Sequence, residues 1–250
     1  MTTWDYTQLA PTYSHRPPYA ARAVERIVTA GGRSQPRVAD IGAGTGHLTL
    51  GLVQYGCSVD AVEPNDAMRS IGQERTADQP SVHWRTGTAE STGLPQGAYD
   101  LVTFGSSFNT TDTTRALAEA SRILTDGGWM ACIWNHRQLD DPLQMSIEQL
   151  IQERVPDYSY GSRRADQAPV IEASGLFSPV TKIEEAFVHD MPLDDWIAAW
   201  RSHATLQRQA GALFDSVVND IEALVRSKID DTIRIPYTTV GWMAPRRGAL

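Results

Sequence analysis

Apolar and polar positions alternate with two different periods along the first half of the chain. Five short runs are apolar on both faces: residues 37–41, 58–63, 82–85, 99–104 and 129–134. Segments of helical period lie before and between these runs, at residues 19–29, 46–55, 65–75 and 112–124. Buried parallel strands separated by helices have this pattern, so it predicts an α/β fold with a parallel sheet.

The second half of the chain has a different order of elements. Residues 140–155 and 193–226 have the period of amphipathic helices, whereas residues 180–189 and 232–243 alternate with the period of strands. We expect the two strands to close the sheet as an antiparallel edge. The long helical segment between them is expected to lie over the sheet as a lid. Together the two halves predict a seven-stranded, mostly parallel sheet with helices on both faces.

The chain lacks a Pro-, Gly- or Ser-rich linker between its halves. We therefore expect a single domain over residues 1–250. Within it we expect N-terminal flap helices at residues 1–35 and a cofactor-binding core at residues 36–136. Substrate-side helical elements are expected at residues 137–178 and 190–230.

Composition and charge narrow the classes of partner. Of 250 residues, 41% are apolar and 21% charged, which is ordinary for a globular protein. The formal net charge is −8, and the pairs at residues 163–164 and 246–247 are too short to form a basic patch, so we expect no nucleic-acid partner. No run of about 20 apolar residues is present, and the N-terminus has no basic region before an apolar run. We expect neither a membrane span nor a signal peptide.

The two cysteines, Cys57 and Cys132, both lie in apolar stretches. Neither has a second Cys or a His at the spacing of a metal site. This arrangement indicates free thiols in a reducing cytoplasm and no metal centre.

A glycine-rich turn follows the first predicted strand directly. The segment Asp40-Ile41-Gly42-Ala43-Gly44-Thr45-Gly46 leads from a strand into a helix, whose free N–H groups favour a negatively charged ligand. His47 stands where the dinucleotide-binding fingerprint has its last glycine, and the Gly-Lys-Ser/Thr of a P-loop is absent. A cofactor with a carboxylate suits this turn, although a turn that only packs the helix on the strand would have the same residues.

An acidic residue ends the second predicted strand. Glu63 follows Gly46 by 17 residues, and a carboxylate at that strand end can accept hydrogen bonds from both ribose hydroxyls of a nucleoside. The alternative is that Glu63 only caps the helix that follows it.

The ordered set of segments resembles the class I S-adenosylmethionine-dependent methyltransferases, in particular the small-molecule branch called type 11 or UbiE-like. The resemblance covers roughly residues 36–136 and rests on five segments: residues 40–46, 62–68, 87–90 with 94–95, 99–102, and 116–124 with 127–128. It implies a Rossmann-like fold, S-adenosylmethionine as cofactor and S-adenosylhomocysteine as product.

The resemblance also implies roles for single residues. Asp40, Gly42 and Gly44 would lie at the amino-acid part of the cofactor, and Glu63 would bind its ribose. The adenine would contact Met68, Ala89 and Glu90, and the flap would contribute Tyr13 and Arg16. Thr88 replaces the usual Asp of the adenine loop, so adenine recognition would rest on one threonine oxygen, Glu90 or backbone groups.

The end of the fourth predicted strand departs from the family. Relatives often have Ala-Phe-His-Trp-Phe-Asp there, whereas this chain has Ser-Phe-Asn-Thr-Thr-Asp at residues 107–112. Aromatic and imidazole groups are replaced by small polar ones at the edge that would face the transferable methyl group. This departure leaves the acceptor, and the reaction itself, open.

Ligands of open α/β sheets bind beyond the carboxyl ends of the strands, which directs attention to two short segments. After the fourth strand, Ser106 could line the cofactor, Asn109 could orient an acceptor, and Asp112 could act as a base or only cap the next helix. After the fifth strand, His136 could deprotonate an acceptor or be a surface histidine.

In the predicted lid, Trp196 and Trp200 share a helical face, which indicates core packing or an aromatic pocket wall. Arg201, His203 and Arg208 would suit an anionic acceptor, or form a solvated face.

Three functions remain open from the sequence. The leading hypothesis is a cytoplasmic methyltransferase for a small molecule of secondary metabolism, with no nucleic-acid or membrane partner and with homodimerisation left open. The second keeps the cofactor but changes the chemistry to a methyltransferase-like cyclase, in which an amine displaces a leaving group within one substrate, for example to form an aziridine. The third is a non-catalytic cofactor-sensing or partner-binding domain.

Overall fold

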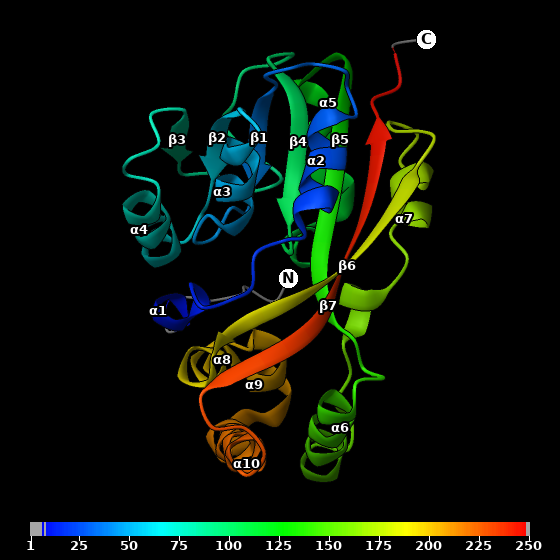
Figure 1. Cartoon of the computed structure of the whole chain (residues 1–250). Coiled ribbons are helices and arrows are strands. Elements are labelled where there is room, and N and C mark those ends of the chain that lie inside the picture. Colours follow the sequence, from blue (N-terminus) through cyan, green and yellow to red (C-terminus); the bar gives the residue numbers. More distant parts are fainter. Residues whose placement is uncertain (1–6, 8, 249–250) are drawn as a thin grey trace.

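The sheet of this protein has seven strands in the order β3-β2-β1-β4-β5-β7-β6 (Figure 1). The structure is a computed structural model that describes residues 7 and 9–248. The N-terminal residues 1–6, where we expected no signal peptide, lie outside the described residues. The parallel strands are β1 (Arg37–Ile41), β2 (Ser58–Val62), β3 (Val82–Arg85), β4 (Tyr99–Gly105) and β5 (Leu124–Arg137). Strand β7 (Thr232–Pro245) is antiparallel to β5 and to the edge strand β6 (Thr181–Pro192), which confirms the predicted sheet.

Helices cover both faces of the sheet. One apolar cluster joins a face of the sheet to α2 (Ala21–Thr29) and α3 (His47–Gln54), and a second joins the other face to α5 (Thr113–Ile123) and α7 (Ala168–Ala173). The remaining helical segments are α1 (Ala10–Tyr13), α4 (Asp66–Arg75), α6 (Pro142–Arg154), α8 (Leu193–Arg201), α9 (Ala204–Ala210), α10 (Phe214–Arg226), η1 (Phe108–Thr110), η2 (Gly161–Arg164) and η3 (Gly211–Leu213).

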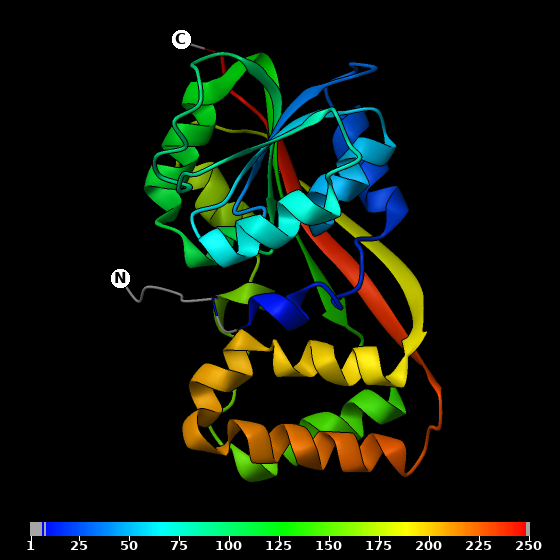
Figure 2. The same ribbon diagram turned by 90° about the vertical axis from the view of Figure 1, so that its left-hand side faces the viewer.

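The predicted lid differs from expectation in two ways. Residues 193–226 form three α-helices: α8 ends at Arg201, and Gly211, with a positive φ of 54°, ends α9. These helices do not lie over the sheet. With α6 they form a separate helical lobe beyond the carboxyl ends of the parallel strands, and α1 lies between the lobe and the sheet (Figure 2).

The helical lobe has an interior of its own. Its apolar cluster contains side chains of α6, α8, α9 and α10, together with Ile233 and Ile235 from the start of β7. The end of the same strand contributes Val240, Trp242 and Ala244 to the core of the sheet. Strand β7 therefore connects two separate apolar interiors along its 14 residues.

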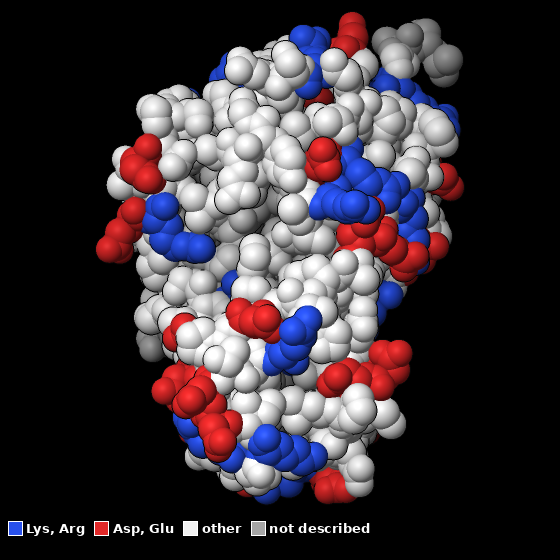
Figure 3. Space-filling view, viewed as in Figure 1, with Lys and Arg blue, Asp and Glu red and all other residues white. Residues whose placement is uncertain are grey.

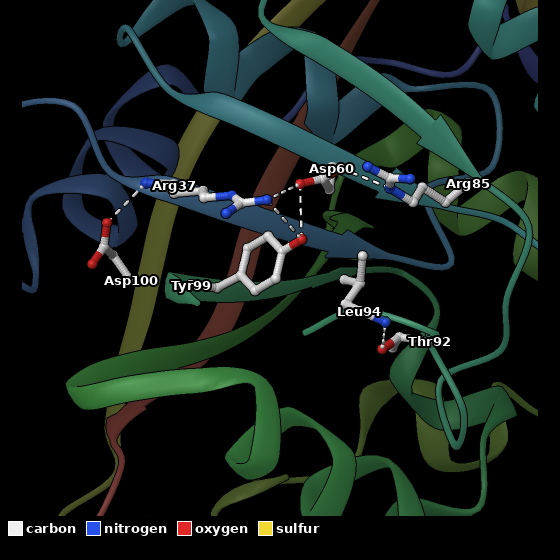
Figure 4. A network of polar contacts seen from close by, with 7 residues as sticks. All are labelled: Arg37, Asp60, Arg85, Thr92, Leu94, Tyr99 and Asp100. Atoms are coloured by element: carbon white, nitrogen blue, oxygen red, sulfur yellow. Dashed lines mark hydrogen bonds and ion pairs between the residues drawn. The ribbon is translucent and has the colours of Figure 1, made fainter. Parts of the chain in front are cut away.

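A buried carboxylate ties four strands together (Figure 4). Asp60 of β2 is only 3% exposed and accepts hydrogen bonds from Arg37 (3.0 Å), Arg85 (3.0 Å) and Tyr99 (2.8 Å). Burial alone would raise the pKa of Asp60, but these three donors hold the pKa below its usual value. The ionised carboxylate thus links β2 to the first residues of β1 and β4 and to the last residue of β3.

The described residues carry few features that would suggest other partners. None of their helices is long and apolar enough to cross a membrane. Cys57 and Cys132 are buried free thiols, and no group of three His, Cys, Asp or Glu side chains within the described residues could hold a metal ion. On the face seen in Figure 3, acidic and basic side chains lie in small adjacent groups.

Candidate functional site

The main candidate site is a cavity between the sheet and the helical lobe, at the carboxyl ends of β1, β4 and β5. It holds about 1060 Å³ of empty space, counting the part that opens to solvent. The sheet side is lined by the glycine turn, Ser106 and Asn135, and the lobe side by Met191, Trp196, Trp200 and His203. One cavity therefore touches both parts of the molecule.

The glycine turn has the conformation that its residues favour. Gly42, Gly44 and Gly46 all have positive φ angles, of 66°, 58° and 82°, which side chains other than glycine rarely adopt. A Cβ atom on Gly42 would lie 2.6 Å from the Cβ of Ser107, and one on Gly44 would lie 3.3 Å from the Met68 methyl group. Because Gly42 and Gly44 carry no side chain, the backbone of the turn is exposed to the cavity.

Asp40 is the carboxylate that lines the cavity beside this turn. It is fully buried, and its oxygens accept hydrogen bonds from Thr49 (2.7 Å) and Thr103 (2.9 Å). Burial raises the pKa of Asp40 to about 6, although both threonine hydroxyls oppose the rise. Asp40 can therefore change its charge just below neutral pH.

Glu63 faces the same turn from the end of β2. Its carboxylate accepts hydrogen bonds from the backbone N–H groups of Gly44 (2.9 Å) and Asn65 (2.8 Å), and burial raises its pKa. The helix N-cap is not Glu63 but Asn65, whose side chain accepts from the N–H of Met68. A carboxylate has about four acceptor positions, so Glu63 retains capacity for two further donors.

Neither Glu63 nor the predicted adenine contacts belong to the cavity lining. Thr88 forms an isolated bridge with Ser91, Ala89 packs on the apolar core, and Glu90 accepts a hydrogen bond from the backbone N–H of Asp112 (2.8 Å). The structure brings Gly44, Glu63 and Met68 together, as the family resemblance implies.

The N-terminal flap is held to both sides of the cavity. Tyr13 and Arg16 line it, with the Arg16 guanidinium 4.1 Å above the Tyr13 ring and donating to the Ser202 carbonyl (2.6 Å). His47, which departs from the dinucleotide fingerprint, contacts the carbonyl of Ser14 at 3.2 Å. His47 thus holds the flap against the glycine turn.

Ser106 stands in a strained conformation at the end of β4. Its φ of 58° is the one positive value among the described non-glycine residues, and such strain is retained mainly where it serves function. Its hydroxyl lies 2.9 Å from that of Tyr19, and both residues line the cavity.

The three candidate catalytic residues lie in different surroundings. Asp112 is the N-cap of α5, and Asn109 accepts a hydrogen bond from the Trp134 indole (2.9 Å); neither lines the cavity. His136 does line it, and its Nε2 lies 3.2 Å from the carbonyl oxygen of Arg163. Burial, together with the nearby charges of Arg164 and Arg163, lowers the pKa of His136 to about 4, so the imidazole is neutral at pH 7.

A group of four arginines lines the cavity, and sequence reasoning largely missed it. The arginine group consists of Arg16 from the flap, Arg137 from the end of β5, and Arg163 and Arg164 from η2. The sequence signal was present at residues 158–164, where two tyrosines precede an Arg-Arg pair. Of the three basic lid residues, His203 lines the cavity, whereas Arg201 pairs with Glu222 (3.0 Å).

Aromatic side chains surround the arginine group. The Arg137 guanidinium lies 3.9 Å above the Trp200 ring and that of Arg164 lies 4.4 Å above Tyr160. Trp196 and Trp200 contact each other edge to face in the lobe interior and both line the cavity, so the two roles open from the sequence are compatible.

Comparison with known proteins agrees with this geometry. Residues 39–132 match a family model described as a methyltransferase domain. An uncharacterized methyltransferase of Mycobacterium tuberculosis is 36% identical over 122 residues, and a ubiquinone/menaquinone biosynthesis C-methyltransferase of Methylobacterium nodulans is 35% identical over 108 residues. These alignments cover 49% and 40% of this chain and 48% and 43% of the relatives, so the chain spans about half their length or less.

Solved structures extend the likeness to nearly the whole fold. A candidate Type II methyltransferase of Anaeromyxobacter dehalogenans has a TM-score of 0.69 over 92% of this chain and 97% of its own, at 19% identity. The phosphoethanolamine N-methyltransferase 2 of Haemonchus contortus, solved with S-adenosylmethionine, has a TM-score of 0.57 over 99% of this chain and 59% of its own, at 15% identity. The family model matched over residues 39–132, the glycine turn and this fold all agree with a resemblance to the class I S-adenosylmethionine-dependent methyltransferases.

Proposed function

We propose that this protein transfers a methyl group from S-adenosylmethionine to a small-molecule acceptor, and that it does so in the cytoplasm as part of secondary metabolism. The observation that carries the proposal is the single cavity that connects the glycine turn with the aromatic side chains of the helical lobe. The flap and the lobe enclose this cavity, which favours a small acceptor over a macromolecule. The likeness to the quinone C-methyltransferase covers the cofactor half and leaves the acceptor open.

The residues at the turn fit this cofactor. Gly44 leaves space that a Cβ atom would fill, and Glu63 has spare acceptor positions for two ribose hydroxyls. Asp40 would offset positive charge at the amino-acid end, and Met68 would pack on the adenine. When bound, S-adenosylmethionine supplies a methyl group on a positively charged sulfur, which is already strongly activated.

The chain's own residues then contribute mainly alignment and the exclusion of water. His136 is the candidate proton acceptor: because the Arg163 carbonyl only accepts, the proton lies on Nε2 and Nδ1 is free to take another. With a pKa of about 4 it is a weak base. Asp112 and Asn109, which do not line the cavity, have no role in this proposal.

The first test is binding of S-adenosylhomocysteine, measured by calorimetry. We expect one site per chain. Candidate acceptors are then incubated with the protein and S-adenosylmethionine, and a product heavier by about 14 mass units, the mass of a CH₂ group, is expected. A protein that binds neither form of the cofactor would contradict the proposal, and one that binds it without any turnover would favour the sensing domain.

The arginine group favours a second candidate, the methyltransferase-like cyclase. In that reaction the nitrogen of an amine forms a bond to carbon, and the leaving group departs from that carbon as an anion with the bonding electron pair. Four guanidinium groups could stabilise such an anion. A product that has lost the mass of its leaving group, with no gain of a methyl group, distinguishes cyclisation from methyl transfer.

Cofactor binding should depend on Glu63. Replacing Glu63 with Ala removes the acceptor for the ribose hydroxyls, and a charged hydrogen bond of about 1.5–3 kcal/mol corresponds to an affinity loss of about tenfold or more. Calorimetric titration with S-adenosylhomocysteine measures the loss. Unchanged affinity in a folded Glu63→Ala variant would contradict the ribose role.

Cofactor affinity should also fall as the pH decreases through about 6. Asp40 is protonated below its raised pKa of about 6, and its neutral form no longer offsets the positive amino group of the cofactor. The histidines of the cavity remain neutral in this range, since their pKa values are lowered: His47 to about 3, His136 to about 4, and His203 well below its usual value. Titrations with S-adenosylhomocysteine at several pH values from 5 to 7.5 check this, and a flat profile would contradict it.

A further inference from the structure

We propose that the acceptor carries an anionic head group, a carboxylate or a phosphate or sulfate ester, which binds between Arg137, Arg164 and His203 on the lobe side of the cavity. This inference rests on the proposed function and adds the chemical class of the acceptor. The head group would bind on the lobe side of the cavity. The aromatic side chains would contact the rest of the acceptor molecule.

The arginine group lacks acidic partners within the part of the chain that the structure describes. None of the ion pairs there involves Arg16, Arg137, Arg163 or Arg164. Their guanidinium groups instead contact carbonyl oxygens, a serine hydroxyl, an imidazole and aromatic rings. Buried charges are normally paired, so this cluster is positioned to receive an anion.

Arg137 and His203 give the strongest indication of a missing acceptor. The Nδ1 atom of His203 accepts a hydrogen bond from the backbone N–H of Leu206 (3.2 Å), so the proton of the neutral ring lies on Nε2. That Nε2 lies 3.3 Å from Nη2 of Arg137, which also can only donate. Two donors therefore face each other above Trp200, and an anion beside them would accept from both.

Arg164 adds a third donor to the same compartment. Its Nη2 donates to the backbone carbonyl of Arg137 (3.0 Å), which fixes the Arg164 side chain to the end of β5. Its Nε atom is buried and has no hydrogen-bond partner among the described residues. A buried N–H without an acceptor costs free energy that a bound oxyanion would recover.

The surrounding charges agree with an anionic ligand. Burial lowers the pKa of Arg163, and the like charge of Arg16 lowers it further. The pKa of Arg137 is raised instead, because nearby tyrosines and Glu148 outweigh the effect of its burial. Two carboxylates face this region. Glu148 accepts a hydrogen bond from the hydroxyl of Tyr160, and Asp40 lines the cavity on its sheet side. Four cations against two acids leave the cavity with a net positive charge.

The cofactor's own carboxylate is the competing explanation for these donors. The experiment therefore uses protein saturated with S-adenosylhomocysteine, in which that carboxylate already has its place. The fluorescence of the tryptophans is followed while phenylacetate, inorganic phosphate or sulfate is added, and chloride at equal ionic strength serves as the reference. We expect at least one of the three anions to cause a saturable change, and the tightest one identifies the head group.

Variants connect the signal to the site. Arg137→Gln and Arg164→Gln should each weaken anion binding by about tenfold or more, since hydrogen bonds to charged groups are lost. Both variants should retain the affinity for S-adenosylhomocysteine. The control is Arg154→Gln, because Arg154 lies on α6 of the same lobe but pairs with Asp220 outside the cavity; it should bind the anion like the wild type.

Two results would overturn the inference. One is wild-type protein that binds S-adenosylhomocysteine but none of the three anions saturably. The other is an Arg137→Gln variant that loses the cofactor itself, which would assign this arginine to the cofactor's carboxylate. Failure of the wild-type protein to bind S-adenosylhomocysteine at all would instead contradict the proposed function.

Discussion

Gly44→Val should abolish binding of S-adenosylhomocysteine while leaving the protein folded. A valine at a φ of 58° adds strain of about 1–3 kcal/mol, and its side chain would fill the space between the turn and Met68. We expect the affinity to fall at least about 100-fold, which corresponds to about 2.8 kcal/mol. Calorimetry measures the affinity, and circular dichroism checks that helical structure persists.

Gly56 provides a control that separates the effect of backbone strain from the effect of a side chain that fills the cofactor site. Gly56 ends α3 with a similar φ of 77°, but the atom nearest to an added Cβ there is a flexible Gln35 carbon at 3.8 Å, outside the cavity. Gly56→Val should therefore lower stability to a similar extent and keep its affinity for the cofactor. If Gly44→Val binds normally, the cofactor lies elsewhere.

Asp60→Asn should destabilise the protein by about 2–4 kcal/mol, because it leaves two arginines and a tyrosine hydroxyl facing a neutral amide. Chemical denaturation at pH 7 measures the change in the free energy of unfolding. Because the pKa of Asp60 is lowered in the fold, its contribution is present above its unfolded pKa of about 3.9 and is lost as the pH falls through the folded value. The difference between the variant and the wild type should therefore shrink in acid.

The matched control is a surface ion pair. Glu185 and Arg26 lie 3.0 Å apart, with the arginine side chain 44% exposed, and Glu185→Gln should cost less than about 1 kcal/mol. Equal losses in the two variants would mean that Asp60 adds nothing beyond an ordinary surface pair. Neither residue lines the cavity, so both variants should bind the cofactor like the wild type.

Local patterns were sufficient to predict the sheet and the glycine turn. Buried parallel strands are apolar on both faces, so β1 to β4 could be located within about one residue from the chain alone. The caps Asn65 and Asp112 were predictable for the same reason, since a cap bonds to N–H groups two or three residues away. Glu63 beside Gly44 was predictable because both stand at carboxyl ends of neighbouring strands.

The lobe side of the cavity depends on contacts that no local pattern reveals. Arg137 and His203 are 66 positions apart, and each is unremarkable in its own segment. The same is true of Asp60, which interrupts an apolar strand and gains its partners only when β1, β3 and β4 assemble with β2 in the sheet. The break at Gly211, which divides the predicted long helix, follows from a backbone conformation that glycine permits but does not require.

The two separate apolar interiors have a consequence for the history of this protein. Side chains of the helical lobe, which under the proposed function would contact the acceptor, can change without disturbing the packing of the sheet. The matched family model ends at residue 132 within β5, before the lobe begins. Divergence of the lobe can therefore change one side of the cavity, with strand β7 as the shared boundary that both parts must preserve.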